Sequence, residues 1–246
     1  MKIRQSGFPG VMQKLAGKGL LLLSVTVMAS ALTGCFDSGK QQFEAARDAA
    51  LKAKDPYLAL ETFRAQSGDY QTSCSVTISS IFSHSCDERG ETEKNIVLAA
   101  LDKGSVPALV FLFDPYGKVP SVYPNDLARP KAEQLAGRLL DLAEKAPADQ
   151  AHQALLLNAA RVSQRGAYVS QNSAKAAAYY IRAWQAGERT AAAELADLYR
   201  YTKDYRRAYF WAIRSRGLNN DDRAQLTGQD ITEIQRLAAD NTRVNL

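Results

Sequence analysis

Histidine and cysteine are scarce in this 246-residue chain, which contains two histidines and three cysteines. The side chains that most often act as general bases, nucleophiles and zinc ligands are therefore few. The sequence also lacks Gly-x-Ser-x-Gly, His-Glu-x-x-His, Walker-type and Gly-x-Gly-x-x-Gly motifs, which position nucleophiles, zinc or phosphate groups. These absences predict a protein that is not an enzyme, with no catalytic residue, no metal site and no cofactor.

Two further polar features have ordinary structural explanations. His152 follows Ala151 in a predicted helix, and we expect it to be a partly exposed helix residue. Asp221 and Asp222 fit the first turn of a last helix, where acidic side chains complement the helix dipole.

Excess positive charge is confined to the start of the chain. The first eighteen residues carry Lys2, Arg4, Lys14 and Lys18 and no acidic residue. Without residues 1–34, the chain has 27 basic against 26 acidic residues. The body is thus nearly neutral, and its charge gives no indication of a nucleic-acid partner.

A short apolar run follows the basic segment. Residues 20–32 are almost wholly apolar, but thirteen residues are fewer than the roughly 20 that a transmembrane helix needs. A basic segment followed by such a run is typical of an export signal.

The run ends in Leu32-Thr33-Gly34-Cys35, which resembles the lipobox of bacterial lipoproteins. The resemblance implies removal of residues 1–34 as a signal peptide, diacylglycerol on the Cys35 sulfur and an acyl chain such as palmitate on its new amino group. Several acyl chains hold a protein on a membrane more firmly than one. The alternative is a secretory signal with a chance cysteine.

The resemblance also bears on localisation. In Gram-negative lipoproteins an aspartate directly after the acylated cysteine favours the inner membrane, and here that residue is Phe36. We therefore expect a lipid-anchored protein on the periplasmic face of the outer membrane. The inner membrane and the cell surface are the other possibilities.

Cys74 and Cys86 are the cysteines that remain if Cys35 is acylated. An even pair in an oxidising compartment favours a disulfide. Free thiols are the first alternative. A metal site that includes His84 is the second, although it lacks a fourth ligand.

The rest of the chain divides into a short tether, residues 35–41, an N-terminal helical segment with the disulfide loop, residues 42–92, and a repeat domain, residues 93–246. Within the N-terminal segment, alanines at helical spacing start near Gln42, and Asp55-Pro56 predicts a break. Residues 71–86 are rich in Ser, Thr, Val and Ile. A strand pair and a helix both fit this segment, so we expect irregular structure.

Internal repetition is the most informative feature of the body. Ala108, Leu112 and Tyr116 follow Gly104 at steps of four, and Ala191, Leu195 and Tyr199 follow Gly187 in the same way. A weaker copy contains Ala151, Leu155 and Ala159, and Ala208-Tyr209-Phe210-Trp211 before Gly217 repeats Ala178-Tyr179-Tyr180-Ile181 before Gly187. Small residues at such steps let paired helices approach closely.

The stretch from Ala154 to Gly187, with Gly166-Ala167-Tyr168-Val169, Lys175-Ala176 and Tyr179-Tyr180, resembles the Sel-one-like repeat family, a relative of the tetratricopeptide repeats. The following unit, Ala191 to Gly217, matches in part. The resemblance implies an all-α fold, an α-solenoid of helix-turn-helix repeats.

A solenoid of this kind usually binds other proteins, so we expect a non-enzymatic scaffold that binds another envelope protein. A defensive lipoprotein, such as an immunity or exclusion factor, is the alternative, and a cell-wall enzyme is a third. Tyrosine and arginine are enriched at interfaces, and the densest cluster of both predicts a partner-binding surface made of Arg200, Tyr201, Tyr205, Arg206 and Arg207.

Overall fold

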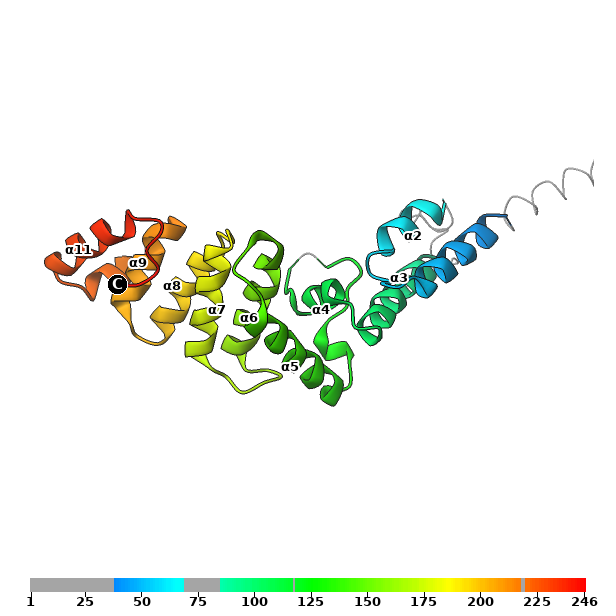
Figure 1. Ribbon diagram of the computed structural model, residues 1–246, viewed down its shortest axis with the longest axis horizontal. Coiled ribbons are helices and arrows are strands. Elements are labelled where there is room, and N and C mark those ends of the chain that lie inside the picture. The colour runs from blue at the N-terminus through cyan, green and yellow to red at the C-terminus, as the bar shows by residue number, and fades with distance from the viewer. Residues whose placement is uncertain (1–37, 69–84, 117, 218–219) are drawn as a thin grey trace, which may run out of the picture.

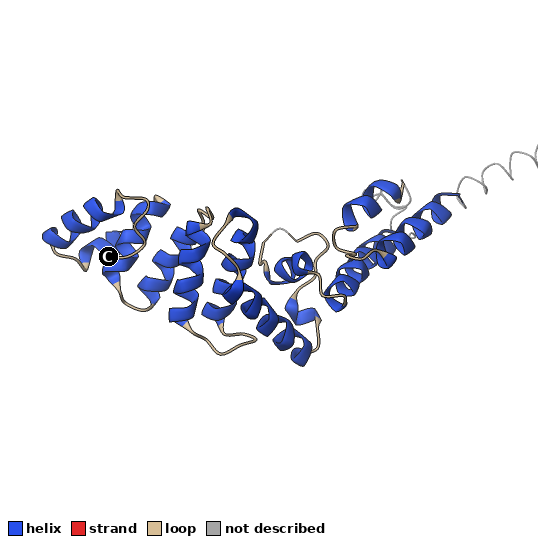
Figure 2. Ribbon diagram, in the orientation of Figure 1, coloured by secondary structure: helices blue, strands red, loops and turns tan. Residues whose placement is uncertain are grey.

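The computed structural model describes residues 38–68, 85–116, 118–217 and 220–246. All regular elements in these ranges are helices, which confirms the predicted all-α class (Figures 1 and 2). A first helix covers residues 38–52. It is followed by α2 Leu60–Gln66, α3 Ser85–Asp102, α4 Val106–Phe113, η2 Pro124–Asp126, α5 Arg129–Lys145, η3 Gln150–His152, α6 Gln153–Arg165, α7 Ser173–Gln185, α8 Ala191–Tyr201, α9 Tyr205–Ser215, α10 Asn220–Ala224 and α11 Gly228–Ala238.

The first helix begins earlier than the sequence pattern predicts. Residues 38–41, which we expected to belong to a flexible tether, are helical. Phe43 anchors this helix to α2 through an edge-to-face contact with Phe63, whose ring centroid lies 5.5 Å away. The predicted break at Asp55-Pro56 lies in the turn between the two helices.

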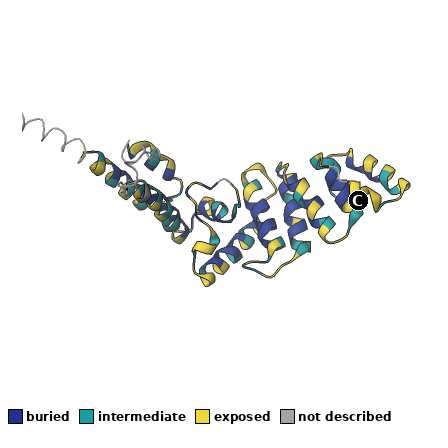
Figure 3. Ribbon diagram, turned by 180° about the vertical axis from the view of Figure 1, so that it is seen from behind, coloured by how far each residue is buried: buried dark blue, intermediate teal, exposed yellow. Residues whose placement is uncertain are grey.

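The helices follow one another along an elongated molecule (Figure 1). From α5 to α9, each helix packs mainly on the helices before and after it, and α11 packs on α9. Their buried residues belong to one hydrophobic cluster, and Figure 3 shows buried residues along the whole series of helices. At the C-terminal end this cluster contains Trp184 and Trp211, which meet edge to face at 5.6 Å between ring centroids.

The positions predicted to lie where helices touch are buried at most of the repeat steps. Each of the following is 0% exposed: Ala108, Leu112, Ala191 and Leu195. Small residues at the starts of α4 and α8 therefore face the interior, as the pattern predicts.

Tyr116 is an exception and lies outside the helix that the repeat pattern predicts. Helix α4 ends at Phe113, and Asp114 has an extended backbone, with ψ of 124°. A residue before proline is biased away from the helical conformation, and Pro115 follows Asp114 directly. Tyr116 therefore lies in a loop and is 66% exposed.

Four helices end in the same hydrogen-bonding pattern. After α3 the N–H of Gly104 donates to Leu101 and the next N–H donates to Ala100; Gly187 ends α7 in the same way. At both positions the glycine has a positive φ, which glycine adopts at little cost. At the ends of α8 and α9 the positive-φ residue is Lys203 or Arg216, with φ of 62° and 59°.

The end of α9 differs from the sequence alignment by one residue. We aligned Gly217 with Gly187, but the residue with the left-handed backbone after α9 is Arg216.

The last two helices also differ from the sequence-based expectation. Asp221 and Asp222 lie in the short helix α10, and the last helix is α11, which Thr227 caps with its side chain.

Several predicted features lie outside the described residues. They are the signal peptide, Cys35, Cys74, His84 and most of the segment 71–86. Cys86 lies in the first turn of α3.

No single helix in the described ranges has the length and hydropathy needed to cross a bilayer. One pair, Glu88–Asp102 and Val106–Phe113, meets that criterion only together and is bent by 118°.

Candidate binding surface

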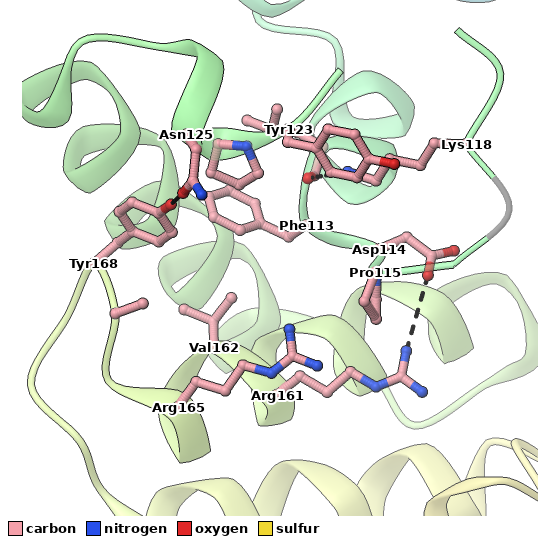
Figure 4. Close-up of a pocket in the computed structure, with 13 residues that line it drawn as sticks. Phe113, Asp114, Pro115, Lys118, Tyr123, Asn125, Arg161, Val162, Arg165 and Tyr168 are labelled. Carbon is pink, nitrogen blue, oxygen red and sulfur yellow. Dashed lines mark hydrogen bonds and ion pairs between the residues drawn. The ribbon is translucent and has the colours of Figure 1, made fainter. Parts of the chain in front are cut away.

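A cavity of about 330 Å³ lies between α6 and the segment that joins α4 to α5 (Figure 4). The segment leaves α4 at Asp114 because of Pro115, and the short helix η2 returns the chain toward α5. Apolar and aromatic side chains form most of the wall, namely Leu112, Phe113, Pro115, Tyr123, Pro124, Val162, Ala167 and Tyr168. The polar lining residues are Asp114, Lys118, Asn125, Arg161 and Arg165.

Tyr168 closes one end of the cavity. Its hydroxyl donates to the side-chain oxygen of Asn125, and its ring meets Phe113 edge to face at 6.2 Å between centroids. These contacts connect the loop after α6 with the loop after α4 (Figure 4). Tyr168 and Phe113 thus form a continuous aromatic part of the wall.

Lys118 is a buried cation in this wall, with 7% of its surface exposed. Its ammonium group donates to the carbonyl of Leu112 at 2.5 Å and to that of Val122 at 2.9 Å. It also lies 4.7 Å from the ring centroid of Tyr123. Burial lowers the pKa of Lys118 to about 8, and the more distant Asp114 and Asp126 only partly oppose this shift. No described carboxylate lies within ion-pair distance of Lys118.

Two arginines of α6 line the cavity and differ in their burial and in their hydrogen-bond partners (Figure 4). Arg161 is buried, donates from Nε and Nη2 to the Glu194 carboxylate at 3.0 and 2.8 Å, and packs under the exposed ring of Tyr116 at 5.1 Å. Arg165 is exposed and forms no hydrogen bond or ion pair within the described ranges. Arg161 thus has its carboxylate, whereas Arg165 is available to a ligand.

A second cavity of about 400 Å³ continues this surface toward α8. Arg161 and Arg165 line both cavities. At the far end of the second cavity lies Tyr201, which is 70% exposed. The two cavities therefore form one surface that extends from Tyr123 to Tyr201, and we call it the binding surface.

Exposed hydrophobic side chains gather along this surface. Six large hydrophobic residues are exposed in the described ranges. Tyr123 and Tyr201 line the two cavities, Tyr116 packs on Arg161, and Val119 follows Lys118. Leu58, Val106, Tyr116 and Val119 line neither cavity, although Tyr116 packs on Arg161, which lines both. Exposed apolar groups that gather at one place are typical of interaction sites.

The predicted cluster of tyrosines and arginines is largely occupied by internal ion pairs. Arg200 binds the fully buried Asp222 through two hydrogen bonds of 2.8 and 2.6 Å. Arg206 bonds to Asp230 and Glu233 at 2.6 and 2.9 Å. These two arginines therefore already have carboxylate partners within the fold, and their role in partner binding stays a prediction.

The remaining members of the cluster are placed differently from one another. Arg207 pairs with Asp204 at 3.2 Å and lies over the ring of Tyr199 at 5.4 Å. Tyr205 is half-buried, and only Tyr201 reaches the binding surface.

The sequence analysis did not identify Lys118, Arg161 or Arg165 as candidate site residues, because the cavity that they line is formed by segments that come together only in the fold. The signal that marked the place was Pro115, which ends the repeat pattern.

The other polar candidates contain no cluster of metal ligands. His152 is half-exposed, as expected, and its Nδ1 lies 2.6 Å from a carboxylate oxygen of Asp149. In the described part of the chain, no three His, Cys, Asp or Glu side chains gather in a way that would hold a metal ion.

No family model, no curated protein and no solved structure matches this chain.

Proposed function

We propose that this protein is a lipid-anchored, non-enzymatic envelope scaffold that binds a segment of another envelope protein along the binding surface. The observation that carries the proposal is that two cavities share Arg161 and Arg165 and are bordered by exposed tyrosines at both ends. A surface of this length fits an extended polypeptide better than a compact small molecule.

The lining of the binding surface favours a partner segment that contains both acidic and apolar side chains. The first cavity has three cations, Lys118, Arg161 and Arg165, and one acid, Asp114. The second cavity adds Glu194 and Asp197. An acidic side chain of the partner would approach Arg165, and apolar side chains would contact the wall formed by Phe113 and Tyr168.

We also propose a specific architecture for the helices and a specific location for the protein. An α-solenoid of Sel-one-like repeats is supported by the packing of successive helices and by the shared endings at Gly104 and Gly187. Such stacks present long surfaces for protein partners. The lipobox motif at Cys35 supports acylation, and Phe36 after it supports the periplasmic face of the outer membrane.

Site-specific photocrosslinking in cells tests the proposal. A photoreactive amino acid in place of Tyr116 or Tyr201 should crosslink to one protein partner. The same amino acid in place of Leu58 is the matched control. Leu58 is 66% exposed like Tyr116, but Tyr116 packs on Arg161, which lines both cavities, whereas Leu58 is not among the lining residues of either cavity. Crosslinks that are absent at both tyrosines, or equally frequent at Leu58, would refute the proposal.

A further inference from the structure

A separate cavity of about 650 Å³ lies at the C-terminal ends of α7, α9 and α11. Three arginines line it, Arg189, Arg214 and Arg216, together with Trp184, Ser215 and Asn241. No acidic side chain of the described residues is part of the lining. It shares no residue with the binding surface.

Arg214 has donors that the fold leaves without acceptors. Its Nη2 donates to the carbonyl of Asp240 at 2.5 Å, whereas Nε and Nη1 are buried and have no hydrogen-bond partner. The guanidinium lies over the ring of Phe210, 4.2 Å from its centroid, and burial lowers the pKa of Arg214. The carboxylate of Asp240 accepts instead from Thr242. A buried donor without an acceptor is unfavourable, and such groups call for an explanation.

Arg189 adds a second cation to the same place. Its guanidinium carbon lies 4.8 Å from the ring centroid of Trp184, and that of Arg214 lies 5.7 Å from the same centroid. Neither side chain forms an ion pair within the described ranges. Two guanidinium groups without an ion pair at one indole ring make the potential in the cavity positive, and the Asp240 carboxylate opposes it only in part.

Arg216 stands where the backbone favours glycine. Its φ of 59° is left-handed, and the equivalent helix ends after α3 and α7 have Gly104 and Gly187. A residue with a Cβ is strained in this conformation. Lys203 after α8 has the same conformation but does not line the cavity, whereas Arg216 contributes a third guanidinium to its lining.

We propose that this cavity binds a phosphate group. Arginine forks match phosphate oxygens in pairs of hydrogen bonds, and a bound phosphate would supply the negative charge that Arg189, Arg214 and Arg216 lack as an ion-pair partner. A phosphate monoester carries nearly two negative charges and so neutralises three arginines better than a single carboxylate does. The cavity is larger than one phosphate ion, so the phosphate belongs to a larger molecule, either a soluble phosphorylated compound or the headgroup of a lipid.

Calorimetric titration of the full-length protein in neutral detergent with pyrophosphate tests the site. Wild type should bind pyrophosphate saturably and acetate far more weakly. Arg216→Gly and Arg189→Gln should each weaken pyrophosphate binding by roughly tenfold, as expected for the loss of a charge-assisted contact. Arg216→Gly also relieves backbone strain, so weaker binding in this variant cannot be attributed to unfolding.

Lys203→Gly is the matched control. It removes one positive charge at the only other non-glycine position with a positive φ in the described residues, and Lys203 does not line the cavity. Its pyrophosphate affinity should equal that of wild type. Equal weakening in Lys203→Gly and Arg216→Gly, or no saturable binding by wild type, would overturn the proposal.

A second experiment identifies the source of the phosphate. Protein in neutral vesicles is mixed with other vesicles that contain phosphatidic acid. Capture of these vesicles by wild type and Lys203→Gly but not by Arg216→Gly supports a lipid headgroup. Pyrophosphate binding without capture supports a soluble phosphorylated ligand. Capture that is undiminished in both Arg216→Gly and Arg189→Gln would contradict a headgroup site at this cavity.

Discussion

Arg200 and Arg206 are expected to contribute differently to the stability of the fold, because their carboxylate partners are buried to different extents. Arg200 binds Asp222, which is 0% exposed, whereas Arg206 binds Asp230 and Glu233, whose side chains are 22% and 49% exposed. The hydrogen bonds to Asp222 also raise the pKa of Arg200 above its ordinary value. Arg200 is therefore a fixed part of the C-terminal fold, and Arg206 is a surface residue.

Replacement of the two arginines tests this difference. Arg200→Ser leaves the buried carboxylate of Asp222 without its partner and should lower the free energy of unfolding by about 2–3 kcal/mol. Arg206→Ser removes only exposed ion pairs and should cost less than about 1 kcal/mol. Urea denaturation measures both values. Similar losses in the two variants would show that the burial of Asp222 does not govern the effect.

Lys118 should give the protein a distinctive dependence of stability on pH. Its pKa falls from 10.5 to about 8 in the fold, so the folded chain releases this proton at a lower pH than the unfolded chain. Between pH 8 and about 9.5 the unfolded chain binds more protons, and the contribution of Lys118 to stability must rise with pH. Below pH 8 the amine is charged in both states, and the cost of burying it is fully present.

Urea denaturation across this pH range compares wild type with Lys118→Met. The stability of wild type should rise by about 1 kcal/mol relative to the variant between pH 8 and 9.5. A pH above about 10 is avoided, because burial raises the pKa of Tyr179 and Tyr180 and their effect has the opposite sign. Parallel pH profiles for the two proteins would show that Lys118 titrates normally.

At the scale of the helices, close packing at small residues decides which substitutions are tolerated. Ala191 opens α8 and is 0% exposed, so Ala191→Leu should overpack this contact and cost about 1–3 kcal/mol. Ala193 is exposed in the same helix turn, and Ala193→Leu should be nearly neutral. Thermal unfolding followed by circular dichroism compares the two variants, and equal melting temperatures would contradict the packing at Ala191.

At the scale of the whole molecule, the N-terminal helix over residues 38–52, the candidate binding surface and the arginine-lined cavity follow one another along the elongated chain (Figure 1). The helix over residues 38–52 lies at one end of the elongated chain, and α11 lies at the other (Figure 1). If Cys35 is acylated, as we propose, the arginine-lined cavity would belong to the end of the chain opposite the acylated end. That arrangement would let it meet a ligand in the periplasm or on a facing membrane.

Acylation at Cys35 is tested by labelling cells with radioactive palmitate. Wild type should incorporate the label, and Cys35→Ser should not and should accumulate as the uncleaved precursor, since the sulfur that receives diacylglycerol is absent. Cys86→Ser is a suitable control, because it removes a cysteine outside the lipobox. Equal labelling of wild type and Cys35→Ser would end the lipoprotein hypothesis.

The sequence by itself predicted the features that depend on local spacing. Alanine and leucine at steps of four predicted the helices and the burial of Ala108 and Ala191, because the helix period alone decides which side chains share a face. Gly166, which the sequence analysis used only through the family resemblance, ends α6. The helical spacing wrongly included Tyr116, because it took no account of Pro115 directly before it.

The tertiary structure alone decided which charges are paired. Arg200 and Asp222 are 22 residues apart, and Arg161 and Glu194 are 33 residues apart, so no local pattern relates the partners. The same holds for Lys118, Arg165 and Arg214, whose environments are built by segments that approach one another only when helices pack. The ion pairs that a charged side chain forms depend on which residues surround it in space. Periodicity in the sequence predicts which residues share a face of one helix, but it does not predict which faces of distant helices pack together.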